Sequence, residues 1–161
     1  MINIGDKVEN KTILLTGNEQ AQLNDYLDKY LVIYFYPKAN TSGCTTESND
    51  FNELHSEFIE NDTEILGASK DTLKRQENFK AKYRFNFELI ADEQEELCHY
   101  FDVIKEKKNY GRTYMGIVRS TFLIDDKGVL IKEWRNLRVK NHAQDVFDFI
   151  KGLSRSSSTE G

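Results

Sequence analysis

The chain has 161 residues, of which 39% are hydrophobic and 30% are charged, a composition typical of a single soluble globular domain. Its formal net charge is −5, and its arginines are scattered along the chain. This argues against nucleic acid as the main partner, because phosphate binding needs a concentrated basic patch.

The spacing of apolar residues and the turn residues predict strands that alternate with helices. The predicted strands are Thr12–Leu15, Leu31–Tyr36, Glu64–Ser69 and Phe87–Ala91, followed by a hairpin of Thr121–Ile124 and Val129–Trp134. The predicted helices are Glu19–Lys29, the segment after Cys44, Asp71–Tyr83 with Asp71 as its cap, Asp92–Phe101 and Asn141–Lys151. The polar stretch Lys105–Gly111 is expected to be a mobile connection. This order predicts an α/β fold with a mixed central sheet flanked by helices.

We expect one domain over residues 1–153 and a disordered, serine-rich tail over residues 154–161. The first residues have neither the basic start nor the apolar stretch of a secretory signal. No run approaches the roughly 18 apolar residues of a membrane span, so no membrane association is expected. Two cysteines are too few for a disulfide framework, and a reducing cytoplasm is the simplest compartment for them.

Cys44 lies where a loop passes from the buried strand 31–36 into a helix. Open α/β sheets bind their ligands at the carboxyl ends of strands, which is where this loop lies. Cys44, Phe51 and Phe58 are one heptad apart, so they share a helix face toward the core. Unpaired N–H groups and the helix dipole in a first turn favour a thiolate, the nucleophilic form of cysteine. Position alone would instead favour an inert, buried cysteine.

The segment Pro37–Cys44 resembles the active-site motif P-x-x-x-T-x-x-C of the peroxiredoxins. The preceding Tyr34-Phe35-Tyr36 and the following Thr45 look like the PrxQ subgroup, also called bacterioferritin comigratory protein. The segments Gly5-Asp6, Ile65–Ser69 and Tyr114–Asp125 are similar to that subgroup in order and spacing, so the resemblance covers nearly the whole chain.

The resemblance implies a thioredoxin-like fold with an N-terminal extension and a thiol-dependent peroxidase that serves in antioxidant defence. Cys44 would attack an oxygen of hydrogen peroxide or of an organic hydroperoxide and become a sulfenic acid. Thr41 would hydrogen-bond the peroxide, Pro37 would shield the sulfur, and Arg119 would hold the thiolate and polarise the peroxide. The alternatives are a surface ion pair for Arg119 and a helix cap for Thr41. Glu47 could complete a capping box or orient Arg119.

Two positions depart from the subgroup. Ser42 stands where many members have proline, which the chemistry does not need. Asn49 stands where many PrxQ members have a second, resolving cysteine, and the predicted helix 71–83, where others have it, contains none. The apolar neighbours of Cys98 favour a buried structural thiol, with a resolving role as the alternative. We therefore expect an external thiol as reductant (thioredoxin, glutaredoxin or a small thiol) and a monomer or weak dimer.

Other cysteine chemistries fit the sequence poorly. A dithiol oxidoreductase would need a C-x-x-C motif, which Cys44-Thr45-Thr46-Glu47 lacks. A cysteine phosphatase would need an arginine six residues after the cysteine, where Asp50 stands. The histidines are dispersed, so neither a metal site nor another cofactor is expected. The second hypothesis is a redox-sensing or chaperone-like binding protein that uses the same oxidisable Cys44 without efficient turnover.

Overall fold

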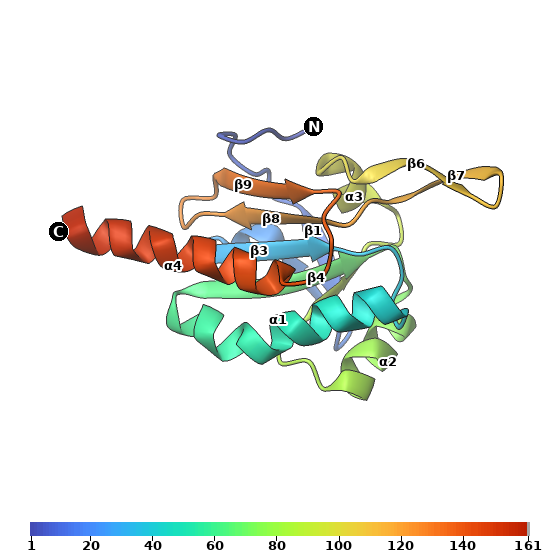
Figure 1. The fold of residues 1–161 in the computed structure, drawn as a ribbon, viewed down its shortest axis with the longest axis horizontal. Coiled ribbons are helices and arrows are strands. Elements are labelled where there is room, and N and C mark those ends of the chain that lie inside the picture. The colour runs from blue at the N-terminus through green and yellow to red at the C-terminus, as the bar shows by residue number, and fades with distance from the viewer. Residues whose placement is uncertain (161) are drawn as a thin grey trace.

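The computed structural model describes the backbone of residues 1–160 and the side chains of residues 1–153 (Figure 1). Along this part of the chain the strands are β1 (Thr12–Leu15), β2 (Glu19–Gln22), β3 (Tyr30–Phe35), β4 (Thr63–Ser69), β5 (Leu89–Ala91), β6 (Ile104–Asn109), β7 (Arg112–Ile117), β8 (Ser120–Ile124) and β9 (Leu130–Arg135). The helices are α1 (Ser42–Glu60), α2 (Leu73–Tyr83), α3 (Glu96–Tyr100) and α4 (His142–Glu160), with a 3-10 turn, η1, at Leu23–Tyr26. None of the helices described is long and apolar enough to cross a membrane.

Seven strands form one mixed sheet in the order β2-β1-β5-β4-β3-β8-β9. The central strands β3, β4 and β5 run parallel to one another. The strands at the two sides are antiparallel to their neighbours: β8 to β3, β9 to β8, β1 to β5 and β2 to β1. The predicted α/β fold with a mixed central sheet is thus confirmed, and the N-terminal extension includes the hairpin β1–β2.

The side chains of β3 divide between two cores, one on each face of the sheet. Leu31, Ile33 and Phe35 pack with α3, η1 and the N-terminal segment, whereas Val32 and Tyr34 pack with α1, α2 and α4. Figure 1 shows α1 and α4 together in front of the sheet and α3 behind it. A strand buried on both faces needs a continuous apolar run, and this requirement explains why β3 was recognisable from its sequence.

Residues 19–29 do not form the predicted helix. Their first part is the edge strand β2, which pairs with β1, and their second part is the short turn η1. Gly17 and Asn18 have positive φ angles of 85° and 56°, the backbone that a tight hairpin requires. The hairpin gives the segment a ladder of hydrogen bonds with β1, and this outweighs the short helical spacing of Leu23, Tyr26 and Leu27.

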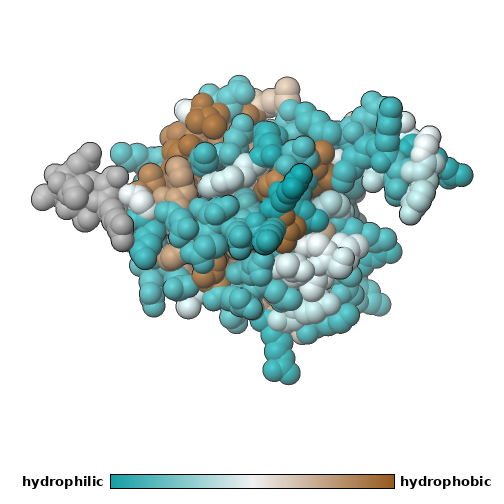
Figure 2. Space-filling model, in the orientation of Figure 1, coloured by the Kyte–Doolittle hydropathy of each residue, from teal (hydrophilic) through white to brown (hydrophobic). Residues whose placement is uncertain are grey.

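The stretch Lys105–Gly111 has regular secondary structure, which its polar sequence does not predict, and its mobility stays a prediction. It forms most of β6 and the turn into β7, in a hairpin that pairs from Ile104↔Ile117 to Asn109↔Arg112. The sequence concealed this hairpin because polar side chains occupy both of its faces over most of its length, so no apolar alternation is present. The hairpin projects from the body of the protein (Figure 1), and its surface is mostly hydrophilic (Figure 2).

Smaller differences concern the ends of elements. Only residues 96–100 of the predicted helix 92–101 are helical, and β5 begins at Leu89 rather than Phe87. The last helix, α4, continues to Glu160. The tail expected to be disordered, 154–161, falls on the end of this helix, whose side chains are not described, and on Gly161, which lies outside the described residues. The disorder of this tail stays a prediction.

Candidate active site

The loop that leads into α1 leaves the carboxyl end of β3, and the register of the sheet places two other segments beside it. The antiparallel pair Phe35↔Ser120 places Arg119, the residue before β8, next to the start of this loop. The parallel pair Phe35↔Ala68 places the end of β4, and Asp71 shortly after it, on the other side. Residues far apart in the sequence therefore meet at one end of the sheet, where α/β folds bind their ligands.

Cys44 lies in the first turn of α1, and only 1% of the residue is exposed. Phe51 and Phe58 are buried in the same cluster, as the heptad spacing predicted. Nη2 of Arg119 donates a hydrogen bond to Sγ of Cys44 over 3.4 Å. Gly43 permits this approach, because a Cβ at that position would lie 3.2 Å from Nη2. Sγ therefore lies beside a guanidinium and at the positive end of the dipole of α1.

Glu47, one turn further along α1, holds the other side of the guanidinium. Nη1 of Arg119 donates to Oε1 of Glu47 over 2.7 Å, and the Glu47 side chain is 1% exposed. Burial raises the pKa of Glu47 to about 7, although the guanidinium opposes this. Among the described side chains, Oε2 of Glu47 has no hydrogen-bond partner. Of the two roles considered for Glu47, these contacts are those of a residue that orients Arg119.

Thr41 and Pro37 lie in the loop around the sulfur. Thr41 occupies the N-cap position of α1, but its hydroxyl does not cap the helix and donates instead to the carbonyl of Lys38 over 2.8 Å. This leaves the hydroxyl oxygen free to accept a hydrogen bond from a peroxide O–H. Pro37 is half-buried and lines a pocket that Arg119 also lines. The structure thus brings Arg119 into contact with Sγ and places Thr41 and Pro37 in the adjacent loop.

Asp71 fixes this loop, a role that the sequence analysis missed. The cap of α2 is Thr72, whose hydroxyl accepts a hydrogen bond from the Arg75 amide, so the predicted cap at Asp71 was wrong. Asp71 instead accepts hydrogen bonds from the amide of Ala39 over 2.7 Å and from the Ser69 hydroxyl over 2.6 Å. The available signal was its place just after the carboxyl end of a strand that neighbours the loop.

Two buried tyrosines form the wall behind Cys44. The Tyr34 hydroxyl donates to Ser48 over 2.8 Å, and the Tyr36 hydroxyl donates to Gln76 over 2.6 Å. Burial raises the pKa of both phenols well above the usual value, so both stay neutral. They therefore pack in the same buried cluster as Cys44 without adding negative charge to it.

Cys98 lies on the opposite face of the sheet. It is fully buried in the core with α3, whereas Cys44 belongs to the core with α1. Its amide donates to Asp92 over 2.8 Å, and burial together with the Asp92 charge raises the pKa of the Cys98 thiol far above its usual value. Both cysteines are free. The surroundings of Cys98 are those of a protonated structural thiol that the sheet separates from Cys44.

Known proteins share this architecture along most of their length. Residues 4–133 match the AhpC/TSA family. Peroxiredoxin Bcp of Bacillus subtilis is 46% identical over 153 residues, which cover 95% of this chain and 98% of the relative. Peroxiredoxin Bcp of Xanthomonas campestris is 47% identical over 141 residues, which cover 88% of each chain.

Solved structures agree with these matches. A cysteine-to-serine mutant of PrxQ from Xylella fastidiosa is 40% identical and has a TM-score of 0.91, covering 96% of this chain and 98% of that one. The bacterioferritin comigratory protein of Xanthomonas campestris, studied for its alkyl peroxide reduction activity, is 44% identical with a TM-score of 0.85, covering 91% of this chain and 98% of that one.

A thioredoxin-like sheet that presents a buried, arginine-bound cysteine at the start of a helix defines a thiol-dependent peroxidase. The chain belongs to the AhpC/TSA family, as one of its peroxiredoxins of the Bcp or PrxQ type. The family, fold and enzyme class that the sequence predicted are thus confirmed.

Proposed function

We propose that Cys44 is the nucleophile of this peroxidase and that Arg119 is its principal electrostatic catalyst. The observation that carries the proposal is the 3.4 Å contact between Nη2 of Arg119 and Sγ of Cys44 in a buried site. A thiolate is needed to break the O–O bond, and a fixed cation beside the sulfur favours that form without a proton transfer from a base.

In this mechanism the Cys44 thiolate attacks one peroxide oxygen, so that an S–O bond forms as the O–O bond breaks. Negative charge moves from sulfur to the leaving oxygen, which takes a proton and departs as water or an alcohol. The planar guanidinium of Arg119 stabilises the negative charge that develops on the leaving oxygen in the transition state. Glu47 holds this guanidinium in place. Thr41 binds the peroxide, and Pro37 shields the sulfur from water. Cys44 is left as a sulfenic acid.

The proposed substrates are hydrogen peroxide and organic hydroperoxides. The attacked group is the same O–O bond in both, and the contacts of Arg119 and Thr41 involve only that group. The alkyl peroxide reduction activity of the Xanthomonas campestris relative, 44% identical, supports the organic substrates. Removal of such peroxides is the basis of the proposed role in antioxidant defence.

The sulfenic acid is proposed to be cleared by an external thiol. Asn49 stands where many PrxQ members have a resolving cysteine, and Cys98 is a buried thiol on the far face of the sheet whose pKa is raised far above its usual value. Thioredoxin, glutaredoxin or a small thiol are the proposed reductants, and the enzyme is proposed to act as a monomer or weak dimer. Its two free cysteines support a reducing compartment such as the cytoplasm.

The test is a single turnover of the reduced protein with one equivalent of hydrogen peroxide, without added thiol. We expect the wild type and Cys98→Ser to consume the peroxide at the same rate and Cys44→Ser to leave it unconsumed. If Cys44→Ser consumes peroxide as fast as the wild type, the assignment of the nucleophile is wrong.

A further inference from the structure

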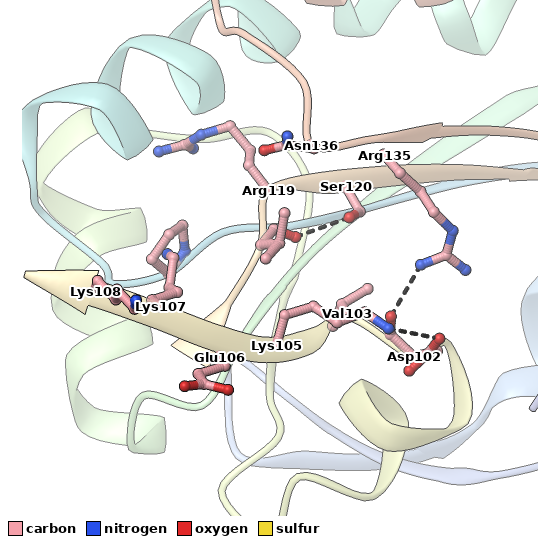
Figure 3. Close-up of a pocket in the computed structure, with 12 residues that line it drawn as sticks. Asp102, Val103, Lys105, Glu106, Lys107, Lys108, Arg119, Ser120, Arg135 and Asn136 are labelled. Atoms are coloured by element: carbon pink, nitrogen blue, oxygen red, sulfur yellow. Dashed lines mark hydrogen bonds and ion pairs between the residues drawn. The ribbon is translucent and has the colours of Figure 1, made fainter. Parts of the chain in front are cut away.

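Beside the active site, the β6–β7 hairpin and the end of the sheet enclose a pocket of about 640 Å³, a size suited to a small molecule. Figure 3 shows Arg119 on one side of this pocket and Lys107 and Lys108 on the hairpin across from it. Because Arg119 lines the pocket and also contacts Sγ of Cys44, a ligand in the pocket would be separated from the sulfur only by the Arg119 side chain.

The pocket has an excess of positive charge. Its charged lining residues are Lys105, Lys107, Lys108, Arg119 and Arg135, against Asp102 and Glu106. Lys105 is paired with Asp102 over 2.8 Å, Arg119 with Glu47 over 2.7 Å and Arg135 with Glu133 over 3.1 Å. Among the described side chains, Lys107 and Lys108 have no ion-pair partner, and Figure 3 shows the Glu106 carboxylate directed away from Arg119. A protein with a net charge of −5 thus concentrates unpaired positive charge next to its nucleophile.

Lys107 is held in a fixed position rather than free in solvent. Its Nζ donates to the carbonyl of Ile117 over 2.7 Å, two residues before Arg119. Its stem lies against Gly116, where a Cβ would come within 3.1 Å of the Lys107 Cδ. The half-buried ammonium has two further protons to donate, and these are available to an anionic ligand.

We propose that this pocket binds the carboxylate of the reducing thiol, so that the reductant is a low-molecular-weight thiol that carries a carboxylate. The proposal rests on the proposed function, in which the reductant comes from outside the chain. Cys44 is 1% exposed, so an incoming thiol must wait for the first turn of α1 to open. A thiol already anchored by Lys107, in the field of the neighbouring Lys108, is present at that moment, and this raises its effective concentration at the sulfur.

The reduction needs two thiols. The first thiolate attacks the sulfur of the Cys44 sulfenic acid, so that an S–S bond forms, the S–O bond breaks, and the departing hydroxide takes a proton and becomes water. A second thiolate attacks the sulfur of the bound thiol in this mixed disulfide and releases Cys44 as a thiolate. The two thiols lose two electrons in total, and the sulfenic acid gains them.

The test compares three thiols of similar size that differ in charge: 3-mercaptopropionate, 2-mercaptoethanol and cysteamine. The sulfenic form is prepared with one equivalent of hydrogen peroxide, and its rate of reduction by each thiol is measured. Each rate is divided by the rate of the same thiol with a small disulfide, which corrects for intrinsic reactivity. We expect a preference of about fivefold or more for the carboxylate over the neutral thiol, and the slowest reaction with cysteamine.

In the double variant Lys107→Gln/Lys108→Gln, the ratio of the corrected rates of the carboxylate thiol and the neutral thiol should fall to about one. The ratio should persist in the control Lys7→Gln/Lys127→Gln, which makes the same charge change on exposed lysines at the far end of β8. In the wild type it should also collapse at about 1 M salt, where charges are screened over about 3 Å. Equal corrected rates for the three thiols would overturn the proposal. The proposal would also be overturned if Lys107 and Lys108 favoured a carboxylate only on the hydroperoxide, in the reaction with Cys44, and not on the reducing thiol. Failure of the proposed function would appear separately, as peroxide consumption by Cys44→Ser.

Discussion

Replacing Glu47 with glutamine is expected to remove a loss of unfolding free energy that occurs as the pH rises. The Glu47 side chain is 1% exposed, and burial raises its pKa from 4.5 to about 7. The folded state therefore binds this proton more tightly than the unfolded chain does. The contribution of this bound proton to the unfolding free energy is complete below about pH 4.5 and is lost as the pH rises through about 7. Between about pH 5 and about pH 8 this amounts to about 2–3 kcal/mol of unfolding free energy.

The assay is urea unfolding of the wild type, Glu47→Gln and Glu57→Gln at about pH 5 and about pH 8. Glutamine keeps an acceptor for Arg119 but has no proton to lose. From about pH 5 to about pH 8, the unfolding free energy of Glu47→Gln should therefore fall by about 2–3 kcal/mol less than that of the wild type. Glu57 lies exposed on the same helix, so Glu57→Gln should behave as the wild type does. The same pH dependence in all three proteins would refute the account of Glu47.

Three further substitutions test how the site is assembled. Arg119→Met should slow the first reaction with hydrogen peroxide about 10²–10³-fold in stopped-flow measurements, whereas Arg112→Met, on the exposed hairpin, should not change it. Gly43→Ala should also slow this reaction, by a smaller factor, because the new Cβ would lie 3.2 Å from Nη2 of Arg119 and displace the guanidinium; an unchanged rate would show that this contact has no role. Asp71→Asn should lower the unfolding free energy by about 1–3 kcal/mol in urea titrations, because the charged acceptor of the Ala39 amide is lost, and no change would contradict its role in fixing the loop.

The elements that carry Cys44 could be predicted because their patterns are local. The continuous apolar run of residues 31–36 requires burial on both faces, and β3 has it. The heptad spacing of Cys44, Phe51 and Phe58 predicted the buried face of α1, and all three side chains are buried there. These inferences needed only the period of the helix and of the strand.

The parts that the sequence concealed depend on strand pairing and not on a local apolar pattern. The polar hairpin β6–β7 is held by the ladder between its own two strands, the edge strand β2 is held by its ladder with β1, and neither β6–β7 nor β2 has an apolar pattern of its own. The contact of Asp71 with Ala39 arises from the parallel pairing of β3 with β4. Likewise, the register Phe35↔Ser120 that places Arg119 beside Cys44 could be expected only from the family resemblance.

The most direct test of the account is mass spectrometry of the reduced protein after one equivalent of hydrogen peroxide without added thiol. We expect sulfenic acid on Cys44, or its more oxidised products, and a free Cys98, because the sheet separates the two sulfurs and burial keeps Cys98 protonated. A disulfide would need the two Cα atoms to come within about 7 Å of each other. Rapid and nearly complete formation of a Cys44–Cys98 disulfide would show that Cys98 resolves Cys44 and that this is a two-cysteine enzyme.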